Sequence, residues 1–78
     1  MTKNKDIIIE LIAATCEVDI NKIDIKSSMS TIEEWDSLKQ MDIILNLEEK
    51  FNVEFADIDI IELTSVALLV EFISNEKL

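Results

Sequence analysis

The 78-residue sequence contains no histidine, no glycine and no proline, and Cys16 is its only cysteine. Without histidine, the chain cannot form the usual pairs of nucleophile and general base. A pair of carboxylates could still act as acid and base, but so small a chain has little volume for an enclosed pocket. We therefore expect no catalytic residues and a protein that is not an enzyme.

The absence of glycine and proline also constrains the fold. Both residues form tight turns readily, and glycine is the residue best able to adopt left-handed backbone conformations. Hairpins are therefore disfavoured, and asparagine or aspartate must take the place of glycine where such a conformation is needed. Because 49% of the residues are hydrophobic, the chain has enough apolar surface to fold. We expect a single all-α domain over residues 1–78.

No metal site is predicted from the sequence. A single cysteine excludes a cysteine-rich site as well as an intramolecular disulfide. The best candidate for a calcium loop begins at Asp19, but it has Ile23 at a ligand position and Asp24 where a glycine makes the sharp turn. The same loop has Ser30 where a bidentate glutamate is needed.

The charge of the chain is strongly one-sided. It has 17 acidic and 7 basic residues, which give a net charge of −10 and a pI near 4.1. This charge repels nucleic acid and anionic membranes and favours partners with basic surfaces, although acidity can also serve solubility alone. The sequence shows neither a signal peptide nor an apolar run of membrane-spanning length. We expect a cytoplasmic monomer without membrane insertion.

Apolar residues recur at helical spacing in three segments, which predicts helices over residues 6–16, about 37–51 and about 65–75. One or two helical turns are expected over residues 57–63, and a single turn could open at residue 31. The long connection over residues 18–30 could include a short strand, and its expected anchors on the core are Val18, Ile20, Ile23 and Ile25. The pattern predicts a small bundle of three to four helices with a long loop between the first and second main helices.

The predicted second helix is apolar on two sides. At about 100° per residue, one group of apolar residues forms a stripe wide enough to face a core. This group comprises Ile43, Ile44, Leu47 and Phe51. Leu38, Met41 and Leu45 form a second, narrower strip with acidic neighbours. The narrow strip either packs beneath another segment or docks a partner, whose approach the acids would steer.

Ser37 lies at the predicted start of this helix. Aspartate or serine before an apolar helix is most often an N-cap, and Ser37 with Gln40 has the spacing of a capping box. The tripeptide Asp-Ser-Leu is a weak signal by itself.

Its setting is more specific. The sequence "WDSLKQMDIILNLEEKFNVEF", which follows Glu34, and the later "IIELTSVALLVEFI" resemble the acyl carrier protein family. The resemblance covers essentially the whole chain, including the leading amphipathic helix, the long loop and the acidity. It implies that Ser37 carries a 4′-phosphopantetheine arm that a phosphopantetheinyl transferase adds from coenzyme A, and that Asp36 and Leu38 flank this site.

The resemblance also implies a docking surface on the second helix. Leu38, Met41 and Leu45 match its apolar contacts, and the matching acids are Asp36, Asp42, Glu48 and Glu49. The partners implied are acyl-loading and acyl-processing enzymes with basic surfaces. Residues of the core-facing stripe match positions that face an interior sheltering the acyl group.

Two features depart from the housekeeping carriers of fatty-acid synthesis. Glu34 and Trp35 precede Asp36 where a glycine is usual, and Lys39 follows Leu38 where an acid is usual. These flanking residues look more like those of freestanding carriers of specialised pathways. The resemblance thus implies a carrier of acyl groups in fatty-acid, polyketide or specialised-metabolite synthesis; the alternatives are an aminoacyl or peptidyl carrier and an unmodified acidic helical adaptor. Trp35 could cover the base of the arm or simply pack on the bundle.

Overall fold

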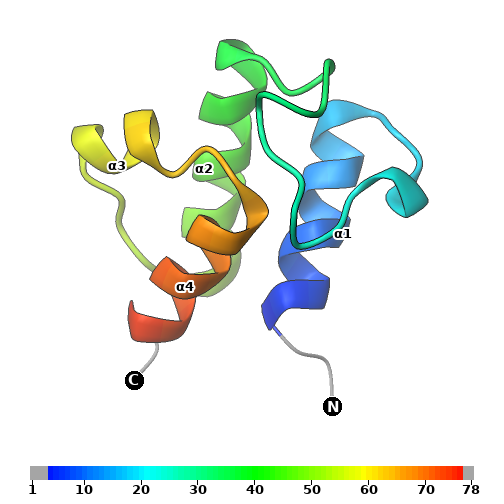
Figure 1. Cartoon of the computed structure of the whole chain (residues 1–78). Helices are drawn as coiled ribbons and strands as arrows, with labels where there is room; N and C mark the ends of the chain where they lie inside the picture. The colour runs from blue at the N-terminus through cyan, green and yellow to red at the C-terminus, as the bar shows by residue number, and fades with distance from the viewer. Residues whose placement is uncertain (1–3, 77–78) are drawn as a thin grey trace.

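The computed structural model describes residues 4–76 and shows a small helical bundle (Figure 1). Its α-helices are α1 (Asn4–Cys16), α2 (Ser37–Phe51), α3 (Asp57–Glu62) and α4 (Val66–Glu76), and a 3₁₀ helix, η1, covers Ile20–Lys22. These bounds confirm the predicted all-α class and, to within two residues, each predicted main helix. The described part of the chain contains no strand, only an isolated bridge between Ser28 and Ser65.

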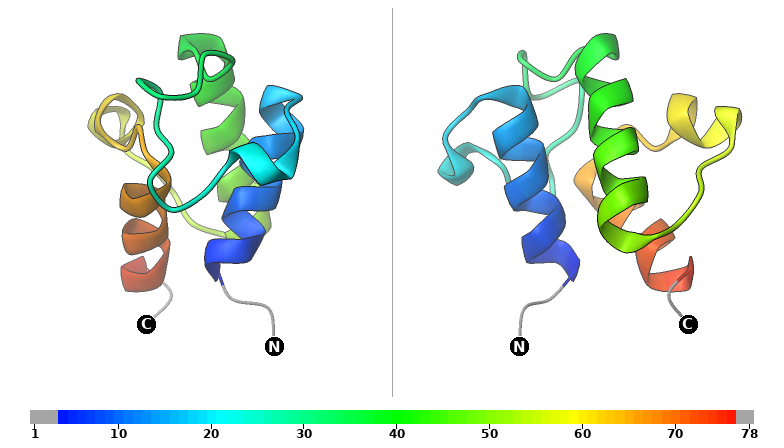
Figure 2. Two further views of the ribbon diagram at one scale, coloured as in Figure 1. Left: turned by 45° about the vertical axis from the view of Figure 1, so that its right-hand side comes forward. Right: turned by 180° about the vertical axis from the view of Figure 1, so that it is seen from behind.

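Helix α1 packs against both α2 and α4, while the short α3 contacts α2 (Figures 1 and 2). Helices α1 and α2 run antiparallel, and α3 lies on the side of α2 that faces away from α1. The side chains buried most completely come from all three long helices and from the segment before α2: Ile8, Ile12, Trp35, Ile43, Ile44, Leu47, Val66, Leu69 and Ile73. Full burial of each aliphatic side chain stabilises the fold by about 1.5–3 kcal/mol, so these contacts set the helix arrangement.

The connection from α1 to α2 differs from expectation. Of the four predicted anchors, Ile23 is buried and Val18 half-buried, but Ile20 and Ile25 are exposed. Ile20 lies in η1, whose tight turn alters the alternating pattern along the loop. No helix forms at Thr31, but one hydrogen-bonded turn follows it, in which the Trp35 N–H donates to the Ile32 carbonyl at 3.0 Å. Thr31 itself joins a hydroxyl-rich turn with Ser28.

Two residues other than glycine adopt left-handed backbone conformations. Asn52 ends α2 with φ 56° and ψ 50°, as expected for a chain in which asparagine takes the place of glycine at a helix C-terminus. Glu17, directly after α1, has φ 60°, which is less common for a glutamate. The chain therefore ends α1 and α2 sharply without glycine.

Candidate functional site

Ser37 is the first residue of α2, and Asp36 is its N-cap. The Asp36 backbone is extended (φ −107°, ψ −173°), and its Oδ1 accepts a 2.9 Å hydrogen bond from the Lys39 N–H. Of the two residues that could cap the helix, Asp36 performs this role and Ser37 does not. The Ser37 side chain is exposed, and its hydroxyl has no hydrogen-bond partner among residues 4–76. It is therefore free to be modified.

The position of Ser37 suits a phosphate diester. The first backbone hydrogen bond of α2 joins the Gln40 N–H to the Asp36 carbonyl at 2.8 Å, so the Ser37 and Leu38 N–H groups precede it. Such N–H groups form the positive end of the helix dipole and favour a bound anion. The residues present thus fit a phosphopantetheine arm on the serine oxygen.

Trp35 lies two residues before Ser37 but does not project over it. Its side chain is 2% exposed, and its Nε1–H donates a 2.8 Å hydrogen bond to Gln40 Oε1. Of the two roles considered for Trp35, the structure supports packing in the bundle. The indole fixes the segment that leads into α2 by contacts on the inside of the molecule.

Gln40 links α2 to α3. It is 3% exposed, and its Nε2 donates to the carbonyl oxygens of Ile60 and Leu63, each at 2.9 Å. The capping box predicted with Ser37 is therefore wrong, because the Gln40 amide points into the bundle. Sequence reasoning missed this role although a signal existed: at about 200° from Leu38, Gln40 is a polar residue within the core-facing stripe.

A cleft of about 280 Å³ begins at Ser37 and extends between α2 and α3. Its lining is mostly apolar: Met29, Ser37, Gln40, Met41, Ile60, Ile61 and Thr64. The sequence had suggested that the core stripe of α2 faces the interior that shelters an acyl group. That stripe does face the interior, where Ile43 and Leu47 are 0% exposed. The space beside the serine is made mainly by other residues.

The narrow strip on α2 is exposed to solvent. Leu38 is 78% exposed, Leu45 57% and Met41 44%, so these side chains do not pack beneath another segment. Asp42 and Glu49 beside them are exposed as well. Single exposed apolar residues are common, but a strip bordered by carboxylates is the pattern of a binding surface.

The acids assigned to this surface are not equivalent. Glu48 is only half exposed, and its Oε2 accepts a 2.9 Å hydrogen bond from the Phe55 N–H. This carboxylate therefore holds the segment that leads from α2 to α3. Asp36 likewise has one oxygen engaged in capping. Asp42 and Glu49 have no such partner among the described residues.

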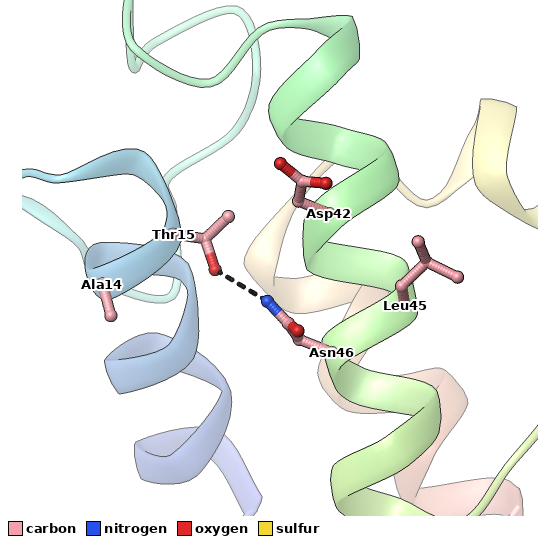
Figure 3. Close-up of a pocket in the computed structure, with 5 residues that line it drawn as sticks. All are labelled: Ala14, Thr15, Asp42, Leu45 and Asn46. Carbon is pink, nitrogen blue, oxygen red and sulfur yellow. Dashed lines mark hydrogen bonds between the residues drawn. The ribbon is translucent and has the colours of Figure 1, made fainter.

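A shallow groove of about 430 Å³ separates α1 from α2 beside Asp42 (Figure 3). The Thr15 and Asn46 side chains point toward each other across it and form a 3.3 Å hydrogen bond from Asn46 Nδ2 to Thr15 Oγ1. Ala14 and Leu45 complete its lining. This groove lies along the side of α2 that faces α1, while the Ser37 cleft lies along the side that faces α3.

Cys16, at the end of α1, lies close enough to the start of α2 to interact electrostatically with Lys39, Asp36 and Glu34. Burial raises the pKa of the Cys16 thiol above its ordinary 9.0, while the Lys39 ammonium lowers it and the two carboxylates raise it. The thiol is therefore protonated and uncharged at neutral pH. Its side chain is 3% exposed and packs in the core.

The described residues contain neither a metal-binding cluster nor a membrane-spanning helix. Within residues 4–76, no group of three or more histidine, cysteine, aspartate or glutamate side chains is placed to hold a metal ion. No helix among the same residues is long and apolar enough to cross a bilayer.

A helical bundle that presents a free serine at the start of its second helix, beside an apolar cleft, has the construction of a carrier protein. Comparison with protein families agrees: the family described as "Phosphopantetheine attachment site" matches residues 6–73. The chain belongs to this family, and its cofactor is 4′-phosphopantetheine. A search of curated proteins gave no match to this chain.

Proposed function

We propose that this carrier protein holds acyl groups as thioesters on a 4′-phosphopantetheine arm attached to Ser37 and presents them to biosynthetic enzymes. The observation that carries the assignment is the exposed Ser37 hydroxyl, which has no hydrogen-bond partner among the described residues and stands at the first position of α2. The arm supplies a terminal thiol. The chain's own cysteine, Cys16, cannot serve in its place because it is buried.

Attachment depends on a transferase, because the chain has no histidine to act as a general base toward Ser37. A bond forms between Ser37 Oγ and the phosphorus that bears the pantetheine, and the anhydride bond of coenzyme A breaks. Adenosine 3′,5′-bisphosphate leaves, and the serine proton passes to a base of the transferase. The absence of histidine from this sequence is consistent with a base that the transferase supplies.

Partner enzymes would dock on the exposed face of α2. Leu38, Met41 and Leu45 supply the apolar contacts, and the acidic border attracts a basic surface. Among the assigned acids, Asp42 and Glu49 are the ones with free carboxylates, so they should dominate the steering. Glu48 contributes charge from a fixed position, because it is bonded to the Phe55 N–H.

The cleft favours acyl cargo over aminoacyl cargo. Apolar side chains of Met41, Ile60 and Ile61 line it, and no described carboxylate is part of the lining to pair with an ammonium group. Burial of an unpaired charge is costly, whereas burial of methylene groups is favourable. This supports a place in fatty-acid, polyketide or specialised-metabolite synthesis.

Intact-protein mass spectrometry after incubation with a phosphopantetheinyl transferase and coenzyme A tests the assignment. We expect the addition of one phosphopantetheine group, its loss in Ser37→Ala and its retention in Ser74→Ala, which alters another exposed helical serine. An unchanged mass with several transferases, together with partner binding that is indifferent to Ser37→Ala, would favour the unmodified acidic adaptor instead.

A further inference from the structure

We propose that Gln40 closes the inner end of the Ser37 cleft and thereby limits this carrier to short acyl groups. The proposal rests on the function assigned above, since it concerns an acyl group carried at Ser37. It identifies Gln40 as a residue that determines cargo length and Trp35 as the residue that positions it.

The Gln40 amide is fully hydrogen-bonded. Its oxygen accepts from Trp35 Nε1–H at 2.8 Å, and its nitrogen donates two 2.9 Å bonds to the carbonyl groups of Ile60 and Leu63. The side chain therefore has one orientation, which spans the space between α2 and α3. No buried side-chain nitrogen or oxygen among the described residues lacks a partner, so this network is complete.

The side chains around Gln40 are buried in the core. The cleft begins at the exposed Ser37 and includes Gln40 in its lining, whereas Trp35, Ile43 and Ile44 around it are at most 2% exposed. A chain that extended into the core would have to displace the amide. That displacement would leave an indole N–H and two carbonyl groups without partners, which costs more than the burial of one additional methylene returns.

The space left for an acyl group beside Ser37 is small. The cleft of about 280 Å³ is open to solvent along part of its length, and Met41 and Ile61 on its borders are exposed. The first carbons of an acyl group can contact these side chains. Later carbons can only leave along the exposed face of α2 and α3, where they gain less protection from water.

A series of acyl groups from butyryl to palmitoyl, transferred from their coenzyme A thioesters onto the protein, tests the proposal. For each species we would measure the melting temperature and the rate at which hydroxylamine cleaves the thioester. In the wild-type protein, the melting temperature and the resistance of the thioester to hydroxylamine should both increase with acyl length over the short chains and then stay constant. A steady rise to palmitoyl would overturn the proposal.

Variants separate the amide from general stability. In Gln40→Ala the constant region should begin at longer chains, so that the lauroyl thioester is cleaved several-fold more slowly than in wild type while the butyryl thioester is unchanged. Trp35→Phe removes the donor to Gln40 Oε1 and should shift the limit in the same direction, which provides a second test should Gln40→Ala not fold. Leu47→Ala, a core change away from the cleft, should lower stability without moving the limit. An unmoved limit in both Gln40→Ala and Trp35→Phe would overturn the proposal.

Mass spectrometry of every sample distinguishes a failure of the proposed function from a failure of the length limit set by Gln40. Absence of the acyl-phosphopantetheine group from Ser37 would overturn the proposed function and the length limit with it. A normally loaded protein whose protection follows no limit would overturn the role of Gln40 alone.

Discussion

Glu48 and Phe55 are joined across the turn that follows α2: the Glu48 carboxylate accepts a 2.9 Å hydrogen bond from the Phe55 N–H. Phe55 in turn stacks on Phe72 of α4, with ring centroids 4.5 Å apart. An acid that the sequence assigned to partner docking thus connects α2 to the segment before α3 and, through an aromatic pair, to α4.

This contact predicts different effects for two neighbouring acids. Glu48→Gln should lower the free energy of unfolding by about 1 kcal/mol, because a hydrogen bond to a charged acceptor is weakened. Glu49→Gln should leave it within about 0.5 kcal/mol of wild type, as is usual for an exposed side chain. Urea unfolding measures both values. Equal stability of the two variants would contradict the structural role of Glu48.

The cap of α2 predicts a cost for the loss of Asp36. Asp36→Ala removes the acceptor for the Lys39 N–H, which should destabilise the protein by about 1 kcal/mol. Asp36→Asn and Asp36→Ser can still accept the bond and should retain most of the stability, whereas Ser37→Ala should retain all of it. A large loss of stability in Ser37→Ala would instead assign the cap to the serine.

The two faces of α2 should respond oppositely to truncation. Ile43→Ala creates a cavity in the core and should cost about 2–5 kcal/mol. Leu38→Ala and Leu45→Ala should change stability by less than about 0.5 kcal/mol, because both side chains are exposed. The same two changes should slow modification of Ser37 by a transferase, and Leu68→Ala, an exposed apolar change on α4, provides the control. Unaltered transferase kinetics in both α2 variants would argue against the docking strip.

Burial of Cys16 predicts a loss of stability at alkaline pH. Because its pKa is raised in the folded state, the unfolded chain releases the thiol proton first, near pH 9.0. The contribution of the protonated Cys16 thiol to the stability of the fold is therefore fully present below that pH. It is lost as the pH rises through the folded-state pKa. Comparison of melting temperatures of wild type and Cys16→Ala between pH 8 and 11 isolates this effect, since other groups titrate in both proteins. Parallel curves for the two proteins would contradict it.

The net charge of −10 predicts that salt stabilises the fold. Like charges on one small domain repel each other, and salt at 0.15 M screens interactions beyond about 8 Å. The melting temperature should therefore rise with sodium chloride and with millimolar magnesium. A melting temperature insensitive to both would show that repulsion does not limit the stability of this bundle.

The sequence by itself determined the helical class, the extents of the main helices to within two residues and the division of α2 into buried and exposed apolar faces. These properties follow from local rules: the periodicity of apolar residues sets which side of a helix is buried, and the absence of glycine and proline disfavours hairpins. The serine that stands before the exposed strip, and the family resemblance around it, could also be read from the linear order of residues.

Only the tertiary structure decided which polar groups are engaged. Asp36 is the N-cap and Ser37 is the first helical residue. Sequence spacing cannot tell which of two adjacent residues caps a helix, whereas the backbone geometry does. The roles of Gln40 and Glu48 depend on partners 5 to 23 residues away in the sequence. Such partners meet only when α3 packs against α2, because no local pattern specifies where the orphan carbonyl groups of a short helix will find a donor.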